Sequence, residues 1–291
     1  SSIITNKFLE FSLANADHII CVSNTSKENT VLRATVSPQL VSVIPNAIDS
    51  SSFTPDPSKR NPEFVTIVVV SRLVYRKGMD LLAAIIPLIC SKHAQVQFLI
   101  GGEGPKRVVL EEVREQHQLH DRVRLLGSLK HEHVRDVLVQ GDIFLNTSLT
   151  EAFCIAIVEA ASCGLQVIST KVGGVPEVLP QDMIRLVEPN VPDLVHAVEE
   201  AIRASENGDV VLPNIAHERI KKMYTWDKVA MRTEKVYDSI SNSPVPPLDE
   251  KLNRWYECGA VAGKIYCFLG IIDLLFLLLL NWLIPKQVGF E

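Results

Sequence analysis

The sequence predicts an α/β fold with a parallel sheet wrapped by helices, followed by one helix long enough to cross a membrane. Between residues 65 and 204, short β-branched runs alternate with segments whose apolar residues have helical spacing. This alternation is typical of repeated βα units. Residues 265–284 then form an almost entirely apolar run, and its length matches that of a membrane-spanning helix.

Runs rich in Val, Ile, Leu and Thr mark the strands, because β-branched residues suit a pleated, half-buried surface. The predicted strands cover residues 65–71, 96–100, 123–126, 143–147, 166–170 and 184–187. Apolar residues three or four positions apart mark the helices. The predicted helices cover residues 80–89, 106–116, 131–139, 152–162, a short turn near 176–179, 193–204 and 226–240. Since helices follow strands throughout, we expect the sheet to be parallel.

The first fifty residues do not fit the repeating domain. Residues 16–23 have the pattern of a helix end followed by a buried strand, and residues 41–45 that of another strand. We therefore predict that residues 1–50 are the tail of a preceding α/β domain with an interdomain linker, and that residues 51–240 form the main domain. The beginning of the preceding domain is expected to be missing.

The carboxyl-terminal region predicts a membrane anchor. Residues 241–264 form a Pro-rich and juxtamembrane linker, residues 265–284 a transmembrane helix and residues 285–291 a short tail. Asp273 costs about 2.5–3.5 kcal/mol at mid-span, whereas each Leu, Ile or Phe contributes about 0.3–0.6 kcal/mol, so insertion is favoured. We expect Asp273 to face a partner helix. The alternatives are a buried core helix, or an aspartate that finds water or a headgroup.

Composition excludes several classes of protein. The formal net charge is −5 and the isoelectric point is near 5.9, and no basic stripe supplies the electrostatic footprint of a nucleic-acid-binding protein. The six cysteines lack C-x-x-C or Cys/His spacing. Neither a disulfide framework nor a zinc site is therefore indicated.

Polar residues gather where the predicted strands end, which is the edge at which parallel α/β sheets bind ligands. Arg72 and Lys77 follow the first strand. A guanidinium fork and an ammonium point charge suit a diphosphate, although such a loop is often only solvated. The Gly-rich loop 101–105 follows the next strand, but Arg107 occupies the third glycine position of a dinucleotide fingerprint.

Two glutamates lie eight positions apart, one just before the predicted helix 152–162 and one within it. At 1.5 Å per residue, Glu151 and Glu159 would be about 12 Å apart along the axis. A glycosidase needs its carboxyls within about 5–9.5 Å, so the pair suits a clamp along an extended nucleotide diphosphate sugar. The backbone amides of residues 153–155 could bind its phosphate. The alternative is that Glu151 is a solvated loop residue and Glu159 an exposed helix position.

Together these motifs resemble the retaining glycosyltransferases of the GT-B fold, family GT4. The motifs, in order, are VIPNAID (43–49), RLVYRKG (72–78), GEGP (102–105), LGSL (126–129) and the two glutamates. The resemblance implies a Rossmann-like donor-binding domain after the remnant of an amino-terminal Rossmann-like domain. It narrows, at residues 148–164, 171–180 and 224–238, to the catalytic subunits of phosphatidylinositol N-acetylglucosaminyltransferases.

The resemblance also implies roles for individual residues. Arg72 and Lys77 would hold the diphosphate, Glu151 would contact the donor sugar and Glu159 would hydrogen-bond the ribose. The remaining implied donor-binding residues are Gly102, Leu129, Phe153, Cys154 and Ile155. Many family members have Pro and Gly where this chain has Ala152 and Cys154.

The implied reaction moves N-acetylglucosamine from UDP-GlcNAc to phosphatidylinositol with retention, without a cofactor or a required metal, as the first step of glycosylphosphatidylinositol anchor biosynthesis. The implied setting is the endoplasmic reticulum membrane, crossed once, with the soluble domain on the cytoplasmic side among other subunits of a complex. This chain would supply the donor-binding half and would be inactive alone. The alternatives are a non-catalytic scaffold subunit, a shortened isoform, or a soluble nucleotide-sugar epimerase.

Overall fold

The computed structural model describes residues 2–241 and 243–284, which divide into two compact units. Unit 1 contains the described residues of 1–21, 27–43 and 233–291, and unit 2 contains Val22–Ser26 and Ile44–Arg232. Two helices, α2 (Asn24–Ala34) and α9 (Trp226–Ser241), begin in unit 2 and continue into unit 1. Each unit is described separately below.

Unit 2 is built on a six-stranded sheet in which all neighbouring strands are parallel. The strands are β3 (Val65–Val70), β4 (Val96–Gly101), β5 (Val123–Gly127), β6 (Ile143–Asn146), β7 (Gln166–Thr170) and β8 (Ile184–Val187). Their order is β5-β4-β3-β6-β7-β8. The chain therefore builds outward from β3, returns to place β6 beside it, and then builds outward in the other direction. The point between β3 and β6 is where such sheets bind ligands.

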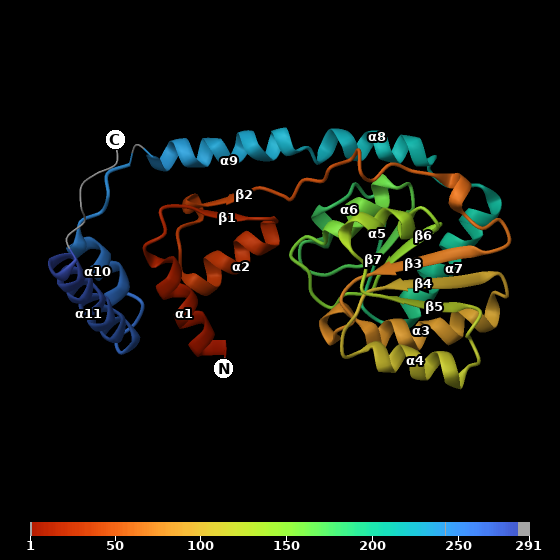
Figure 1. Ribbon diagram of the computed structural model, residues 1–291, viewed down its shortest axis with the longest axis horizontal. Coiled ribbons are helices and arrows are strands. Elements are labelled where there is room, and N and C mark those ends of the chain that lie inside the picture. The colour runs from red at the N-terminus through yellow and green to blue at the C-terminus, as the bar shows by residue number, and fades with distance from the viewer. Residues whose placement is uncertain (1, 242, 285–291) are drawn as a thin grey trace. The chain divides into compact units, whose positions relative to one another are not determined.

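Helices cover both faces of this sheet (Figure 1). On one face lie α3 (Met79–Lys92), α4 (Arg107–Gln116) and α7 (Val191–Asn207), and on the other lie α5 (His131–Leu138), α6 (Ile155–Ser162) and α8 (Pro213–Met223). Successive strand residues point to opposite faces. Ile67 and Val69 therefore pack in the core beneath α3, α4 and α7, and Val68 packs in the core beneath α5, α6 and α8. Three 3-10 turns, η2 (Pro57–Lys59), η3 (Tyr75–Lys77) and η4 (Val175–Glu177), complete the unit.

The predicted alternation of strands and helices is confirmed, with two differences. Helix α6 begins at Ile155 and not at residue 152. Cys154 is its N-cap residue and has a left-handed backbone (φ 67°), which cannot continue a right-handed helix. Helix α8 was not predicted from the sequence. It starts at Pro213, a residue that fits the first turn of a helix because that turn needs no N–H donor.

Unit 1 combines a two-stranded parallel sheet with three packed helices. Strands β1 (Ile19–Cys21) and β2 (Val41–Val43) pair in parallel, and helix α1 (Ser2–Ala14) packs with α10 (Leu248–Tyr256) and α11 (Ala262–Leu283). The turn η1 (Pro38–Leu40) precedes β2. Both strands fall where the sequence predicted them. The expectation of a buried first strand is only partly right, because Ile20 is 41% exposed.

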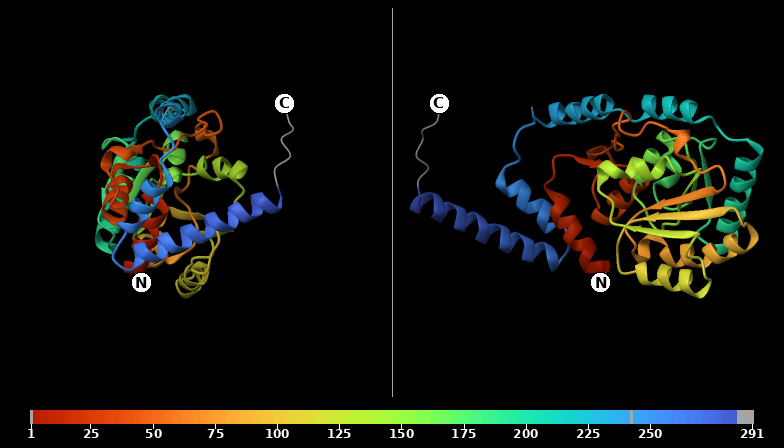
Figure 2. Two further views of the ribbon diagram at one scale, coloured as in Figure 1. Left: turned by 90° about the vertical axis from the view of Figure 1, so that its left-hand side faces the viewer. Right: turned by 45° about the vertical axis from the view of Figure 1, so that its right-hand side comes forward.

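Helix α11 matches the predicted transmembrane segment. It is long and apolar enough to cross a membrane, and little of it is buried in the structure. Its first turns are held by aromatic packing, since the Phe11 ring stacks on Tyr266 at 4.3 Å and lies 5.1 Å from Trp255. Its remaining length extends beyond α1 and α10 (Figure 2). The predicted tail at residues 285–291 lies outside the described residues.

Candidate active site

The loops that follow β3 and β6 lie against each other at the point between these strands. Gly78 has a left-handed backbone (φ 68°), and a Cβ there would lie only 1.7 Å from the carbonyl oxygen of Thr147. The Thr147 hydroxyl donates to the Lys77 carbonyl at 3.0 Å, and the Leu149 amide donates to the Arg76 carbonyl at 2.9 Å. Glycine at position 78 therefore permits the contact that joins the two loops.

This contact places Lys77 beside Glu151. The Lys77 ammonium donates to Oε1 of Glu151, and the Ser148 hydroxyl lies 2.8 Å from the same oxygen. The side chains of Lys77 and Glu151 are 20% and 11% exposed. The sequence placed both residues at the edge of the sheet, but their ion pair was not predicted. Ser148 was also missed, although it ends the polar run that follows β6.

Arg72 lies on the same loop as Lys77 but keeps an exposed side chain. Its loop is bonded to the Gly-rich loop, since the Leu73 amide donates to the Glu103 carbonyl at 2.9 Å. A Cβ on Gly102, whose φ is 141°, would lie 1.8 Å from the Ser71 carbonyl oxygen. Gly102 thus lets the two loops approach. Leu129 is half-buried and packs against Gly101.

The segment between Glu151 and α6 is an irregular loop. Its Phe153 side chain is buried, with the ring 5.6 Å from Tyr224. Burial, with a smaller contribution from the Glu151 carboxylate, raises the pKa of Cys154 to about 12, so the thiol is neutral. Within the described chain, the amides of residues 153–155 donate no hydrogen bond. They are therefore available to an anion at the start of the helix.

The rise of a single helix does not set the separation of the two glutamates. Glu151 precedes α6, so the estimate of about 12 Å along a helix axis does not apply. Its backbone is held instead by the next loop, where the Gly174 amide donates to the Glu151 carbonyl at 3.0 Å. Gly173 (φ 52°) approaches the same oxygen, which a Cβ would meet at 2.0 Å.

Glu177 at the end of that loop binds the start of α2. Its Oε1 accepts from the Thr25 amide and hydroxyl, each at 2.9 Å, and its Oε2 accepts from the Asn24 amide at 2.7 Å and side chain at 2.8 Å. Partial burial opposes ionisation of Glu177, but these bonds together lower its pKa. Within unit 2, Glu177 therefore ties residues 24 and 25 to the loop that supports Glu151.

Glu159 is only 6% exposed, which contradicts the alternative of an exposed helix position. It lines a cavity of about 1030 Å³ together with Ile155, His131, Phe53 and Trp226. Burial raises the pKa of Glu159, and the nearby His131 opposes that shift only in part. Among the described residues, no group hydrogen-bonds its carboxylate. The carboxylate is thus suited to hydroxyl donors that enter the cavity.

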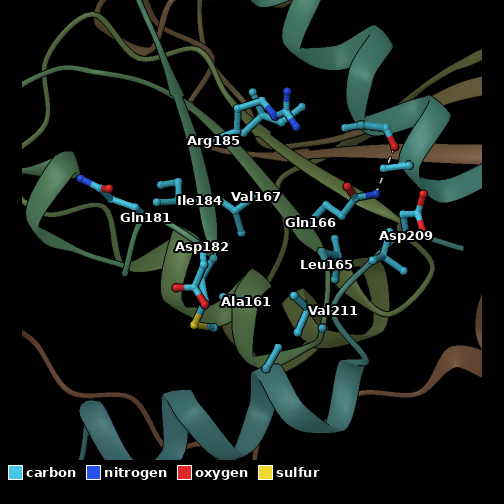
Figure 3. Close-up of a pocket in the computed structure, with 17 residues that line it drawn as sticks. Ala161, Leu165, Gln166, Val167, Gln181, Asp182, Ile184, Arg185, Asp209 and Val211 are labelled. Carbon is cyan, nitrogen blue, oxygen red and sulfur yellow. Dashed lines mark hydrogen bonds between the residues drawn. The ribbon is translucent and has the colours of Figure 1, made fainter.

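A second cavity, of about 430 Å³, lies at the opposite ends of the strands (Figure 3). Gln166 and Ile184, the first residues of β7 and β8, line it together with Arg185. Gln166 is already bonded there, since its Nε2 donates to Ser205 at 2.7 Å. This cavity is separate from the edge that carries Lys77 and Glu151.

An open parallel sheet with charged loops at the point between its two halves defines an α/β protein with a ligand-binding site at that edge. Residues 65–204 match the family model described as glycosyl transferases group 1. The domain formed by these residues belongs to this glycosyltransferase family, which confirms the resemblance.

Two curated relatives are similar to almost the whole of this chain. The chain is 59% identical over 289 residues to a human phosphatidylinositol N-acetylglucosaminyltransferase subunit, covering 99% of this chain and 60% of that protein. It is 54% identical over 286 residues to the equally named protein of Arabidopsis thaliana, covering 98% of this chain and 63% of that protein. The chain thus spans about three fifths of the length of these relatives.

Solved structures confirm the GT-B fold. Sucrose-phosphate synthase from Thermosynechococcus elongatus superposes with a TM-score of 0.68 at 25% identity, covering 82% of this chain and 61% of that one. Anabaena HepE, crystallised with UDP-glucose, superposes with a TM-score of 0.68 at 22% identity, covering 82% and 68%.

Proposed function

We propose that the protein transfers N-acetylglucosamine from UDP-GlcNAc to phosphatidylinositol with retention of configuration, as the first step of glycosylphosphatidylinositol anchor biosynthesis. The observation that carries the proposal is the pairing of Lys77 with Glu151 beside the free amides of residues 153–155. The name of the 59% identical human relative supplies the transferred sugar and the acceptor. In this proposal the chain provides the donor-binding half.

The diphosphate of the donor would lie between the loop of residues 72–77 and the start of α6. An ammonium group has three protons, so Lys77 can bond Glu151 and a phosphate oxygen at the same time. Arg72 and the amides of residues 153–155 add further donors. These groups would stabilise the negative charge that develops on departing UDP, which is commonly the largest single contribution to catalysis. Their positive charge supports the prediction that no metal is required.

The nucleoside would lie toward Glu159. Its buried carboxylate faces a cavity and receives no hydrogen bond from the described residues. The two neighbouring ribose hydroxyls would each donate to it and offset the cost of its burial. We place Gly102 and Leu129 along the same path, as further donor-binding residues.

The sugar would lie over Glu151. The side chain of Glu151 is mostly buried and held by Lys77 and Ser148, so it can accept from a sugar hydroxyl in a fixed orientation. Retention requires the acceptor to attack from the face that UDP leaves. A second bond from Lys77 to the leaving phosphate is consistent with that arrangement.

The apolar helix α11 supports a membrane location. We propose that it anchors the protein in the endoplasmic reticulum membrane, with unit 2 on the cytoplasmic side and with other subunits of a transferase complex as partners. The relatives are named as transferase subunits. Their names favour this interpretation over the scaffold and epimerase alternatives.

The test is transfer to phosphatidylinositol in membranes where the protein carrying this chain replaces the native enzyme. Glu151→Ala and Arg72→Ala should each lower the rate by about 100-fold or more, as loss of a group that stabilises the transition state does. Glu206→Ala and Arg203→Ala, exposed residues of α7, are matched controls and should leave it unchanged. Wild-type rates in the first pair would contradict the site, and absence of UDP binding to the solubilised chain would favour the scaffold.

A further inference from the structure

A buried polar network leads from the sheet to Glu151. The Ser148 hydroxyl lies 2.7 Å from Oδ1 of Asn146 and 2.8 Å from Oε1 of Glu151. The Asn146 amide nitrogen donates to the Ser169 hydroxyl at 2.8 Å. Ser148 and Ser169 are fully buried, and Asn146 is 6% exposed. The network therefore ends at the same carboxylate oxygen that the ion pair with Lys77 holds.

The sheet fixes where this network begins. Asn146 is the last residue of β6 and is paired in register with Ser169 of β7. Strand β6 is also bonded to β3 on its other side, through Ile143 and Phe144, so the strand that ends at Asn146 is fixed within the sheet. Groups carried on such rigid elements are positioned more accurately than groups on loops.

Hydrogen-bond chemistry gives the network a direction. A hydroxyl carries one proton, but Ser148 faces two acceptors, the Asn146 carbonyl oxygen and the Glu151 carboxylate. Bonds to an ionised acceptor are the stronger ones, so Ser148 donates to ionised Glu151. A half turn of the Asn146 amide, whose oxygen and nitrogen are assigned from their neighbours, then lets its nitrogen donate to Ser148. The Ser169 hydroxyl, which donates to the Thr170 carbonyl at 3.1 Å in the structure, then turns to donate to the Asn146 oxygen, and the chain of hydrogen bonds leads toward Glu151.

We propose that Asn146 and Ser148 are positioning residues for the Glu151 carboxylate. Lys77 alone cannot hold Glu151 in one orientation while it also binds the diphosphate. Ser148 supplies the second bond, and Asn146 orients the Ser148 proton toward the carboxylate and away from itself. This inference rests on the proposed function, in which Glu151 contacts the donor sugar during transfer.

The test compares Ser148→Ala and Ser148→Thr with Ser162→Ala in the membrane transfer assay. Ser162 is an equally buried serine of the same unit, and its hydroxyl donates to the Phe53 carbonyl at 2.9 Å, outside the network. We expect Ser148→Ala to lower kcat by about 10- to 100-fold, the effect of a hydrogen bond to a charged group, with little change in KM for UDP-GlcNAc. Ser148→Thr, which keeps the hydroxyl, should restore kcat, and Ser162→Ala should keep it.

Asn146→Asp provides a second variant of nearly the same shape. An ionised carboxylate cannot donate to Ser148 and instead attracts its proton away from Glu151. We expect kcat to fall at neutral pH and to recover toward the wild-type value as pH falls, because a protonated aspartic acid can donate again. A purely structural role for Asn146 would change the amount of folded protein without changing the pH profile of kcat.

The outcomes separate this inference from the proposed function. Wild-type kcat and an unchanged pH profile in Ser148→Ala and Asn146→Asp would overturn the inference if Glu151→Ala is inactive. A fully active Glu151→Ala would overturn the role of Glu151 in transfer itself. Should Ser148→Ala fail to accumulate, the pH profile of Asn146→Asp decides the matter alone.

Discussion

The ammonium of Lys77 contacts the carboxylate of Glu151, a residue 74 positions later in the chain. The two residues follow β3 and β6, which are distant in sequence order but adjacent in the sheet. Their pairing is therefore a consequence of the reversal in strand order. It places a cation and an anion where an α/β sheet binds its ligand.

Replacing Lys77 by Met should abolish transfer and destabilise unit 2. The substitution removes a phosphate donor and deprives the mostly buried Glu151 of its cation, which costs about 1–3 kcal/mol. Lys92→Met is the matched control, because Lys92 forms an exposed pair with Glu199 at 2.7 Å. Such exposed pairs contribute about 1 kcal/mol or less. Denaturant unfolding and transfer rates measure both effects, and equal losses in the two variants would refute this account of the site.

Gly78→Ala should separate the loops that carry Lys77 and Glu151. The new Cβ would meet the Thr147 carbonyl oxygen at 1.7 Å, in addition to the strain of φ 68°. Gly208 has a similar φ of 74°, but a Cβ there would have no atom within 4 Å. Gly208→Ala should therefore cost only the left-handed strain, about 1–2 kcal/mol. A comparison of thermal unfolding and transfer should show a larger loss of both in Gly78→Ala.

Glu159→Gln should stabilise the protein while weakening donor binding. Burial raises the pKa of Glu159, so at neutral pH the folded state carries the cost of an ionised, buried carboxylate. Glutamine removes that cost, and its advantage should disappear as pH falls below the unfolded value of about 4.3. UDP affinity should fall by about tenfold, as expected for loss of hydrogen bonds to a charged group. Unfolding measured from about pH 3 to about pH 8, which spans the titration of a glutamate, together with UDP titration, checks both results.

Glu177→Gln should lower stability in a manner that depends on pH. The pKa of Glu177 is lowered in the folded state, so its contribution is fully present above the unfolded value of about 4.3 and is lost as pH falls through the lower folded value. The difference in unfolding midpoint between wild type and variant should therefore shrink in acid. A difference that stays constant with pH would show that the charge of Glu177 is not responsible.

Asp273→Leu should weaken association with partner subunits more than membrane insertion. Gly263, Tyr266 and Gly270 lie three and four positions apart on α11 and form its packed stripe. The two glycines contact Trp255 of α10, and Tyr266 stacks on Phe11 of α1. Asp273 continues the stripe beyond that contact. Co-purification of the other transferase subunits should decrease while resistance to alkaline extraction is retained. Unchanged co-purification would argue against a partner at this position.

Local patterns were sufficient for much of the fold. Strand β7 was predicted with its observed bounds, because its apolar run is buried and ends in polar residues at the edge of the sheet. The start of α6 was not, because Cys154 adopts a left-handed backbone that only the surrounding loops can impose on a residue other than glycine. The helix therefore begins at Ile155 and leaves a longer loop after Glu151 than the predicted start at residue 152 allowed.

The candidate site likewise combines features that local sequence patterns predict with features that depend on the tertiary structure. The order of charged residues after successive strands was sufficient to place Arg72, Lys77 and Glu151 at one edge, since parallel strands end on the same side. The ion pair of Lys77 with Glu151 depends on the adjacency of β3 and β6 and on the backbone contact at Gly78. Propensity and periodicity act over a few neighbouring residues, whereas these contacts join segments about 70 residues apart. Only packing of the complete sheet brings such segments within hydrogen-bonding distance.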